Sequence, residues 1–237
     1  MEFRNHLLSA IAKSDMHGLL PALSERALER GAVLFEPGEV PDRVFFPSNA
    51  IISVVTVMKN GQAVESSTLG YETALPLLSV LSQRPVTARM FAQVGGAGIS
   101  APASVLRDCA AASPELMTLL LRHADAANYQ AERGVACNVL HDAAARLSRW
   151  LLMTQDRIGS RVLPLTQDYM AIMTGVQRTT ISAVANQLKS EKLIRYSRGA
   201  VEVLDRDGLE ARSCECYAAI RNKFNALPGA AEERGAA

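Results

Sequence analysis

Short apolar runs fill the chain up to residue 112, and residues that favour turns separate them. Runs of this length, rich in β-branched and aromatic residues, predict β-strands. The expected strands are residues 32–35, 44–46, 51–58, 63–69 and 87–94. Asn60-Gly61 favours a tight hairpin between two of them, because both residues tolerate the positive φ of a type I′ turn. The pattern predicts a small β sandwich or barrel behind a helical lead at residues 9–23.

The pattern changes at Ser113-Pro114-Glu115, which supplies a helix N-cap, a first-position proline and a first-turn acid. The stretch that follows has no proline as far as residue 156 and is interrupted only by Gly134. Positions three and four residues apart form one mostly apolar stripe along this predicted helix: Leu116, Leu119, Leu120, His123, Ala127 and Gln130. The stripe can pack against its own domain or against a second copy of the chain.

Residues 165–209 predict two helices and a β-ribbon in close succession. Thr166 is an N-cap for a helix at 167–173, and Gly175 can adopt the left-handed conformation of a tight turn. The second helix runs from Gln177 to about Glu191, with a buried face at Ile181, Val184, Ala185 and Leu188. Residues 193–204 then form a two-stranded ribbon with a basic turn. This order is typical of a winged helix-turn-helix that binds duplex DNA; the alternative is an ordinary helical hairpin.

The opposite face of the second helix carries small and polar side chains, which leave room for base edges in a major groove. Arg178 stands at the N-terminal end, where a guanidinium can donate two hydrogen bonds to guanine. We expect base contacts from Arg178, Thr179, Ser182, Ala183 and Asn186, and phosphate contacts from Thr166, Gln177, Thr180, Lys189 and Arg198.

The formal net charge of +1 conceals a division along the chain. Residues 1–145 carry 11 Lys/Arg against 14 Asp/Glu, whereas residues 146–206 carry 10 against 5. The basic segment coincides with the predicted DNA-binding region, which favours a sensor joined to a nucleic-acid-binding domain. The sequence contains no nucleophile elbow, phosphate-binding loop, dinucleotide fingerprint or paired metal-binding histidines, so we expect no enzyme.

The most apolar run, residues 50–58, is far shorter than the roughly 20 residues of a membrane helix. The first residues also lack the basic and apolar regions of a signal peptide. We therefore expect a cytoplasmic protein with no membrane partner.

The C-terminal pattern, from Leu165-Thr166-Gln167 through Gly175-Val176-Gln177-Arg178 to Asp205-Arg206-Asp207-Gly208-Leu209, resembles the CRP/FNR family of regulators. Residues 30–39 resemble the opening of that family's β-roll. The resemblance implies an α+β fold with an N-terminal cyclic-nucleotide-binding-like β-roll, a long dimerisation helix and a C-terminal winged helix-turn-helix. The implied domains are a β-roll at 1–112, a dimerisation helix and hinge at 113–140, a DNA-binding domain at 141–225 and a flexible tail at 226–237.

The resemblance extends to a subgroup of the family with a Cys-Asn…His…Arg-Leu…Arg-Trp-Leu-Leu run and a C-terminal Cys-Glu-Cys-Tyr. The run corresponds here to Cys137-Asn138, His141, Arg146-Leu147 and 149–152, and the second motif to 214–217. Family members also use a Glu one position after the Arg that reads bases, and often an Arg four positions after that Glu. This chain has Thr179 and Ala183 at those positions. Only Arg178 carries over, so the family's usual operator is not expected.

The family's cyclic-nucleotide sites need a Gly-Glu for the ribose and an Arg followed by Ser/Thr-Ala for the cyclic phosphate. Here Gly70 is followed by Tyr71-Glu72-Thr73, and Arg84 is followed by Pro85-Val86. We therefore expect no cyclic AMP and no other cofactor. Arg84 and Arg89 are candidates for binding an acidic effector, and the alternative is that both are solvated loop cations.

Four cysteines in a cytoplasmic chain of this length predict thiols or metal ligands rather than disulfides. Cys137 and His141 are four residues apart and share a helix face, as metal ligands can. A site formed with Cys214 and Cys216 requires the two regions to meet, and two cysteines two residues apart on a helix point in different directions. The alternative interpretation is that His141-Asp142 starts a new helix and the cysteines pack as small apolar groups.

These expectations together describe a homodimeric, sequence-specific transcription regulator. Its partners are a roughly palindromic operator in double-stranded DNA, a second copy of the chain and RNA polymerase at target promoters. Because helix-turn-helix proteins bind DNA as dimers, we favour the second copy as the surface that buries the apolar stripe. The alternative function is a nucleotide-, metal- or redox-responsive sensor or interaction module whose helix-turn-helix has lost DNA binding.

Overall fold

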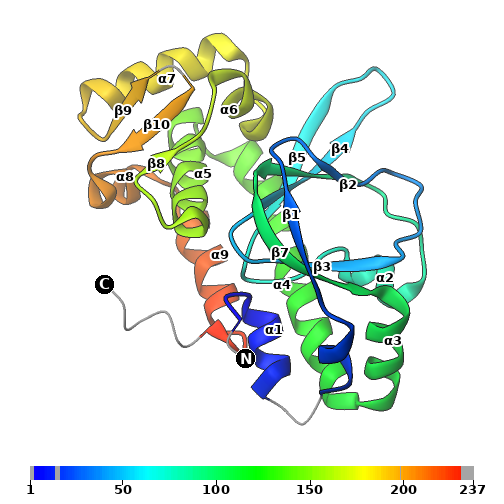
Figure 1. Cartoon of the computed structure of the whole chain (residues 1–237). Coiled ribbons are helices and arrows are strands. Elements are labelled where there is room, and N and C mark those ends of the chain that lie inside the picture. Colours follow the sequence, from blue (N-terminus) through cyan, green and yellow to red (C-terminus); the bar gives the residue numbers. More distant parts are fainter. Residues whose placement is uncertain (1–2, 14–16, 198, 231–237) are drawn as a thin grey trace. The chain divides into compact units, whose positions relative to one another are not determined.

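A computed structural model describes residues 3–13, 17–197 and 199–230 of the chain. The chain divides into two compact units. The first contains residues 1–54, 67–130 and 221–237, and the second contains residues 55–66 and 131–220. Within the described residues, no helix is long and apolar enough to cross a membrane. The elements are mixed helices and strands with a long central helix and a C-terminal helix-turn-helix, which confirms the predicted fold class (Figure 1).

The N-terminal elements begin with a short helix and then alternate strands with turns. They are α1 (His6–Lys13), η1 (His17–Ala22), β1 (Ser24–Leu28), β2 (Val33–Phe35), β3 (Arg43–Pro47), β4 (Ile51–Val57), β5 (Ala63–Leu69), α2 (Leu77–Ser82), β6 (Arg89–Val94), β7 (Gly96–Pro102) and α3 (Ala103–Ala112). The five strands expected from the apolar runs correspond to β2 through β6. The helical lead is confirmed in type, although it is divided into α1 and the 3-10 helix η1.

These strands form two antiparallel sheets with the orders β1-β7-β3 and β2-β6-β4-β5. The sequence pattern missed β1 and β7. Strand β1 is largely polar and exposed, and β7 contains two glycines and only one β-branched residue, Ile99. Close packing requires glycine at position 98 of β7. A Cβ atom there would lie 2.6 Å from the Phe46 carbonyl oxygen, closer than such atoms approach one another, so only glycine lets β7 pair with β3 at this point.

Helix α4 (Pro114–Leu140) begins as the sequence predicts, with the Ser113 hydroxyl accepting a hydrogen bond from the Leu116 amide at 3.1 Å. Its N-terminal half covers the core of the first unit. Leu116, Leu119 and Leu120 pack there with residues of α1, α3 and β3.

The apolar stripe of α4 therefore packs within its own unit, and the prediction that it packs against a second copy is wrong. Its two polar members, His123 and Gln130, each contact a backbone carbonyl of the same unit. The Nδ1 atom of His123 lies 3.1 Å from the Glu72 oxygen, and the Gln130 amide donates to the Thr68 oxygen at 2.7 Å. Helical spacing identifies a buried face, but it does not identify what buries it.

The interruption of the long helix lies at His141-Asp142 and not at Gly134, which is helical. The next helix, α5, spans Ala143–Ile158. Its N-cap is Asp142, whose carboxylate accepts a hydrogen bond from the Ala145 amide at 2.8 Å. An N-cap side chain that satisfies a free amide is what starts a new helix at this point.

The second unit places the remaining elements around α5. They are β8 (Val162–Leu163), α6 (Gln167–Thr174), α7 (Arg178–Ser190), β9 (Ile194–Ser197), β10 (Ala200–Val203), α8 (Arg206–Arg212) and the start of α9 (Cys216–Asn225). The strands form an antiparallel sheet of order β8-β10-β9, so the predicted two-stranded ribbon has a third, short strand. Trp150 of α5 is buried and donates its indole N–H to Glu65 at 3.0 Å.

Candidate nucleic-acid interface and cysteine–histidine cluster

Helices α6 and α7 form the helix-turn-helix, and the turn between them depends on one glycine. Gly175 has φ 65° and ψ 32°, the left-handed conformation that glycine adopts without steric cost. At the start of α6 the Thr166 hydroxyl accepts a hydrogen bond from the Tyr169 amide at 3.3 Å, which confirms its capping role. Gln177 directly precedes α7 in extended conformation and lies at its N-cap position.

The two faces of α7 differ as the periodicity predicts. Its buried residues are Ile181, Val184, Ala185 and Leu188. Of the side chains predicted to contact DNA from α7 and its cap, only Ser182 is half-buried. The others are exposed, namely Gln177, Arg178, Thr179, Thr180, Ala183, Asn186 and Lys189. Figure 1 shows α7 in yellow, followed by the strands β9 and β10. The second unit therefore holds α7 by an apolar face and leaves a polar face available.

Contacts within the helix-turn-helix position two of the predicted base-contacting residues. The Arg178 guanidinium forms an ion pair with Asp168 at 3.1 Å, and both side chains are about two-thirds exposed, at 67% and 63%. The Ser182 hydroxyl donates to Gln167 of α6 at 2.9 Å and lies 3.0 Å from the Arg178 carbonyl oxygen. The sequence identified Asp168 only as a first-turn acid of α6, because nothing in the spacing shows that it faces Arg178.

The wing is the hairpin of β9 and β10, in which Ser197 pairs with Ala200. Gly199 has φ 81° in its turn. Arg195 and Glu202 pair across the hairpin with an N···O distance of 2.7 Å. The predicted phosphate contact Arg198 lies outside the described residues.

The two candidate effector residues lie on the surface of the first unit. Arg84 is exposed in the turn after α2, and Arg89 at the start of β6 forms an ion pair with Glu36 at 2.9 Å. The segment after Gly70 is tied to its own backbone, because the buried Glu72 carboxylate accepts a hydrogen bond from the Gly70 amide at 3.0 Å. An effector role for Arg84 or Arg89 stays a prediction.

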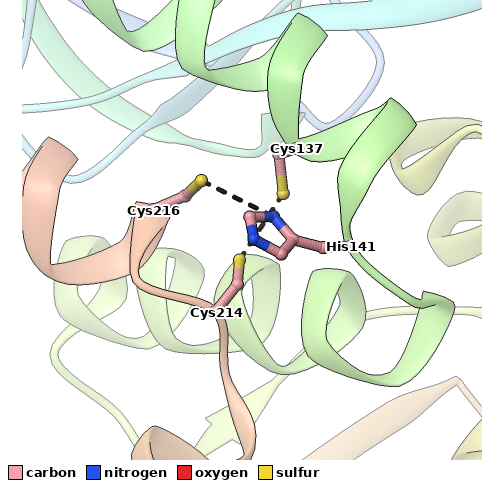
Figure 2. A group of neighbouring side chains, drawn as sticks. All are labelled: Cys137, His141, Cys214 and Cys216. Atoms are coloured by element: carbon pink, nitrogen blue, oxygen red, sulfur yellow. Dashed lines mark hydrogen bonds between the residues drawn. The ribbon is translucent and has the colours of Figure 1, made fainter.

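Cys137, His141, Cys214 and Cys216 converge in the second unit and are called the cysteine–histidine cluster below (Figure 2). Their potential ligand atoms all lie within 4.8 Å of one another. Two of the separations are shorter: 3.5 Å between the sulfur atoms of Cys137 and Cys214, and 3.8 Å between the Cys216 sulfur and His141 Nδ1. Cys137 lies in the last turn of α4, and His141 directly follows that helix. Cys214 lies in the connection after α8, and Cys216 is the first residue of α9.

This convergence corrects one argument made from the sequence. The spacing of Cys214 and Cys216 was expected to aim the two thiols apart, on the premise that both lie on one helix. Cys214 lies in the connection before α9, and only Cys216 is helical. The expected divergence applies only when both residues are helical, and Figure 2 shows both thiols directed toward His141. Asp142 does start a new helix, as the alternative interpretation held, yet the cluster still forms.

The electrostatic environment differs among the three thiols. The hydrogen bond with Cys214 and the positive charge of Arg149 lower the pKa of the Cys137 thiol to about 5, although burial opposes this. The hydrogen bond with Cys137 and burial raise the pKa of Cys214 above its ordinary value, and burial raises the pKa of Cys216. Cys137 is therefore the thiol most readily ionised, and the thiolate is the form that reacts with electrophiles and binds metal ions.

Other residues of the subgroup motifs surround the cluster. Arg146 of α5 donates to the backbone and side-chain oxygens of Asn138 at 3.1 and 3.2 Å, which ties α5 to the end of α4. Tyr217 donates to Asp156 at 2.8 Å, and Arg206 bonds both of these side chains at 2.6 Å. Residues separated widely in sequence thus fix the same region of the second unit.

Comparison with known proteins identifies the class of the molecule. Residues 145–212 match the sequence model of the Crp-like helix-turn-helix domain. The chain is 25% identical over 207 residues to the global nitrogen regulator of Nostoc sp., a match that covers 83% of this chain and 92% of that protein. The corresponding regulator of Synechococcus elongatus is 23% identical over 198 residues, covering 79% and 88%.

Solved structures agree in fold. FixK2 from Bradyrhizobium japonicum superposes with a TM-score of 0.70 at 13% identity, covering 81% of this chain and 98% of that one. A CRP/FNR-family transcriptional regulator from Thermus thermophilus superposes with a TM-score of 0.65 at 20% identity, covering 80% and 98%. The molecule is therefore a transcription regulator with a DNA-binding helix-turn-helix. Its helix-turn-helix matches the Crp-like domain model, and its fold is similar to that of a CRP/FNR-family transcriptional regulator.

Proposed function

We propose that the protein binds a roughly palindromic operator as a homodimer, reads its sequence with α7 and acts without cyclic AMP. The observation that carries the proposal is the polar, exposed face of α7 above the apolar residues that fix the helix in the second unit. A helix held in this way can enter a major groove without losing its own packing. RNA polymerase at the target promoter is the further partner we propose.

Within this face, Arg178 has the leading role in base recognition. Its guanidinium can make paired hydrogen bonds to guanine once it leaves Asp168. Thr179, Ser182, Ala183 and Asn186 provide small or polar contacts along the same side. Thr166, Gln177, Thr180 and Lys189 are proposed to bind phosphates, which fixes the position of α7 in the groove but does not select a sequence.

The dimer is proposed to form through the exposed side of α4. Val135 and Val139 are 69% and 79% exposed, and they share a helix face because they are four residues apart. Leu140, which follows them, is 75% exposed. Exposed apolar side chains grouped on a long helix are what a second copy can cover. This surface replaces the stripe that the first unit buries.

The absence of cyclic AMP dependence is proposed from the local sequence and hydrogen bonding after Gly70. The single acid of this segment, Glu72, bonds the Gly70 amide instead of lying free for a ribose. Arg84, the candidate for the phosphate, is followed by Pro85 and Val86. A calorimetric titration of the protein with cyclic AMP is expected to show no binding, and binding of one equivalent would contradict this part of the proposal.

Two experiments test the remaining parts. Selection of bound sequences from a random duplex library is expected to return a site with twofold symmetry and half-sites about one helical turn apart. Recovery of no enriched sequence at any salt concentration would favour the interaction module without DNA binding. The double variant Val135→Glu/Val139→Glu is expected to be monomeric in sedimentation analysis. Leu78→Glu, which changes an exposed leucine of α2, is the matched control that should leave the dimer intact.

A further inference from the structure

The cysteine–histidine cluster is a closed group of four potential metal ligands that DNA binding does not use. A tetrahedral zinc ion, with bonds of about 2.3 Å to sulfur and 2.0 Å to nitrogen, holds its ligand atoms roughly 3.5–3.8 Å apart. The Cys137–Cys214 and Cys216–His141 separations of 3.5 and 3.8 Å match this spacing. We propose that these three thiolates and the histidine bind one zinc(II) ion as a structural site.

The orientation of His141 supports this proposal. Its Nδ1 atom faces the Cys216 sulfur, whereas Nε2 lies 3.0 Å from the carboxylate of Glu215. A carboxylate that accepts the N–H of one ring nitrogen leaves the lone pair of the other nitrogen free to bind a metal. Glu215 lies between Cys214 and Cys216 in the sequence. The segment 214–216 would therefore supply two of the ligands and also the carboxylate that orients the histidine.

Charge and burial favour zinc over a group of packed thiols. Three thiolates around a divalent cation have a net charge of −1, and the positive charge of Arg149 acts on Cys137. The three cysteines are only 0%, 7% and 1% exposed, so solvent has little access. Four protein ligands without an open position are typical of structural and not catalytic zinc.

Zinc at this site would join two distant parts of the second unit. Cys137 lies in the last turn of α4 and His141 directly follows that helix, whereas Cys214 and Cys216 follow the winged helix-turn-helix. Binding would displace the thiol protons to solvent and link the end of α4 to the start of α9. This link would be independent of the DNA contacts, because none of the ligands lies on α6, α7 or the wing.

The test begins with full-length protein purified under reducing conditions without a chelator. Elemental analysis is expected to find about one zinc per chain, the stoichiometry of a single four-ligand site. Protein stripped of metal should remove zinc(II), added as zinc chloride, from a colorimetric chelator. With cobalt(II) chloride it should develop thiolate-to-cobalt charge-transfer bands and the intense visible bands of tetrahedral cobalt, a measurement on the natural sequence that requires no variant.

Variants then assign the ligands. Cys137→Ser and Cys214→Ser should each lose most of the bound zinc and the cobalt charge-transfer bands, whereas Cys109→Ser, on α3 and outside the cluster, should retain both. Should a serine variant fail to fold, alkylation can replace it: zinc should protect the three clustered cysteines and not Cys109 from iodoacetamide. Folded, reduced protein that neither contains nor takes up zinc overturns the proposal. So does zinc binding that Cys137→Ser leaves unchanged, or tighter binding of cobalt(II) than of zinc, which reverses the order expected at a tetrahedral thiolate site.

Discussion

The helix-turn-helix and the cysteine–histidine cluster lie in the same compact unit, but they are constructed in opposite ways. Helices α6 and α7 follow each other closely in sequence, and most of the side chains proposed to contact DNA are exposed. The cluster joins Cys137 and Cys214, which are 77 residues apart, and buries all three of its thiols. A DNA-contacting surface must meet a large external partner, whereas a structural metal site must exclude water.

This difference determines what each site contributes. Removing an exposed side chain from α7 would take away a proposed contact with DNA but leave the apolar residues that hold the helix. Removing a ligand from the cluster affects the folded chain itself, because its four residues meet only when the distant segments have packed. We therefore expect the two sites to separate experimentally: the cluster should govern stability and the helix-turn-helix should govern DNA affinity.

The largest expected effect is on stability and comes from zinc. At a free zinc concentration of about 1,000 times its Kd, binding to the folded chain alone adds roughly 4 kcal/mol to the free energy of unfolding. Urea titrations of metal-free protein, with and without zinc chloride, measure this difference. Cys214→Ser should abolish the zinc-dependent part, and Cys109→Ser should preserve it. An identical unfolding midpoint with and without zinc would remove the contrast between the two sites.

The next largest effect is also on stability and comes from His123, a buried residue whose partners are distant in sequence. Burial in the first unit, together with the nearby His6, lowers the pKa of His123 from 6.5 to about 4, although the bond to the Glu72 carbonyl opposes the shift. The unfolded chain therefore binds more protons between pH 4 and 6.5. In this window the free energy of unfolding should rise with pH, by about 3 kcal/mol in total, because one pKa unit corresponds to about 1.4 kcal/mol.

Chemical denaturation across this pH range measures the slope. His123→Gln, which keeps a donor for the Glu72 carbonyl but does not titrate, should give a flatter dependence. Above pH 6.5 the histidine is neutral in both states, and the slopes of the two proteins should coincide there. An equal slope for both proteins below pH 6.5 would show that other groups cause the acid sensitivity.

The sequence predicted most accurately those features that a short segment determines. The buried face of α7, the Thr166 cap and the turn at Gly175 follow from helical periodicity and from local backbone preference. The partner of the α4 stripe could not be predicted in this way. The leucines at 116, 119 and 120 specify a buried face, but their neighbours come from α1, α3 and β3.

The same distinction holds within the two sites. The spacing of Cys137 and His141 showed that they share a helix face, because that relation is local. It could not show that the segment 214–216 meets them, nor that Cys214 lies before α9 rather than on it. In the helix-turn-helix, likewise, the sequence predicted a base contact for Arg178, whereas the ion pair of Arg178 with Asp168 became evident only from the packing of α6 against α7.

A smaller effect is expected from Arg178, and it concerns DNA binding alone. Arg178→Ala should cost about 1–3 kcal/mol of specific binding through loss of the paired bonds to guanine. Thermal unfolding should change little, because the side chain is 67% exposed. Fluorescence anisotropy with the selected operator and with a scrambled duplex measures specific and non-specific affinity. Arg30→Ala, an exposed arginine after β1, is the control. Unchanged discrimination between the two duplexes would reject Arg178 as a base-contacting residue.

The smallest effect is expected from Asp168, which holds Arg178 in the free protein. Asp168→Asn removes this ion pair and one negative charge near the predicted DNA surface. Exposed ion pairs contribute about 0.2–1 kcal/mol, so operator affinity should rise by roughly 1.4- to 5-fold. Stability should fall slightly, because Asp168 is also the acid in the first turn of α6, where it interacts favourably with the helix dipole.

A matched control separates these two consequences of changing Asp168. Asp207 is likewise an exposed acid in the first turn of a helix, α8, and Asp207→Asn removes the same kind of dipole interaction without touching Arg178. Both variants should lose similar stability, but only Asp168→Asn should bind the operator more tightly. In an Arg178→Ala background the gain from Asp168→Asn should shrink to the part that comes from net charge alone. A gain that persists in full would mean that Asp168 acts on DNA directly and not by holding the arginine.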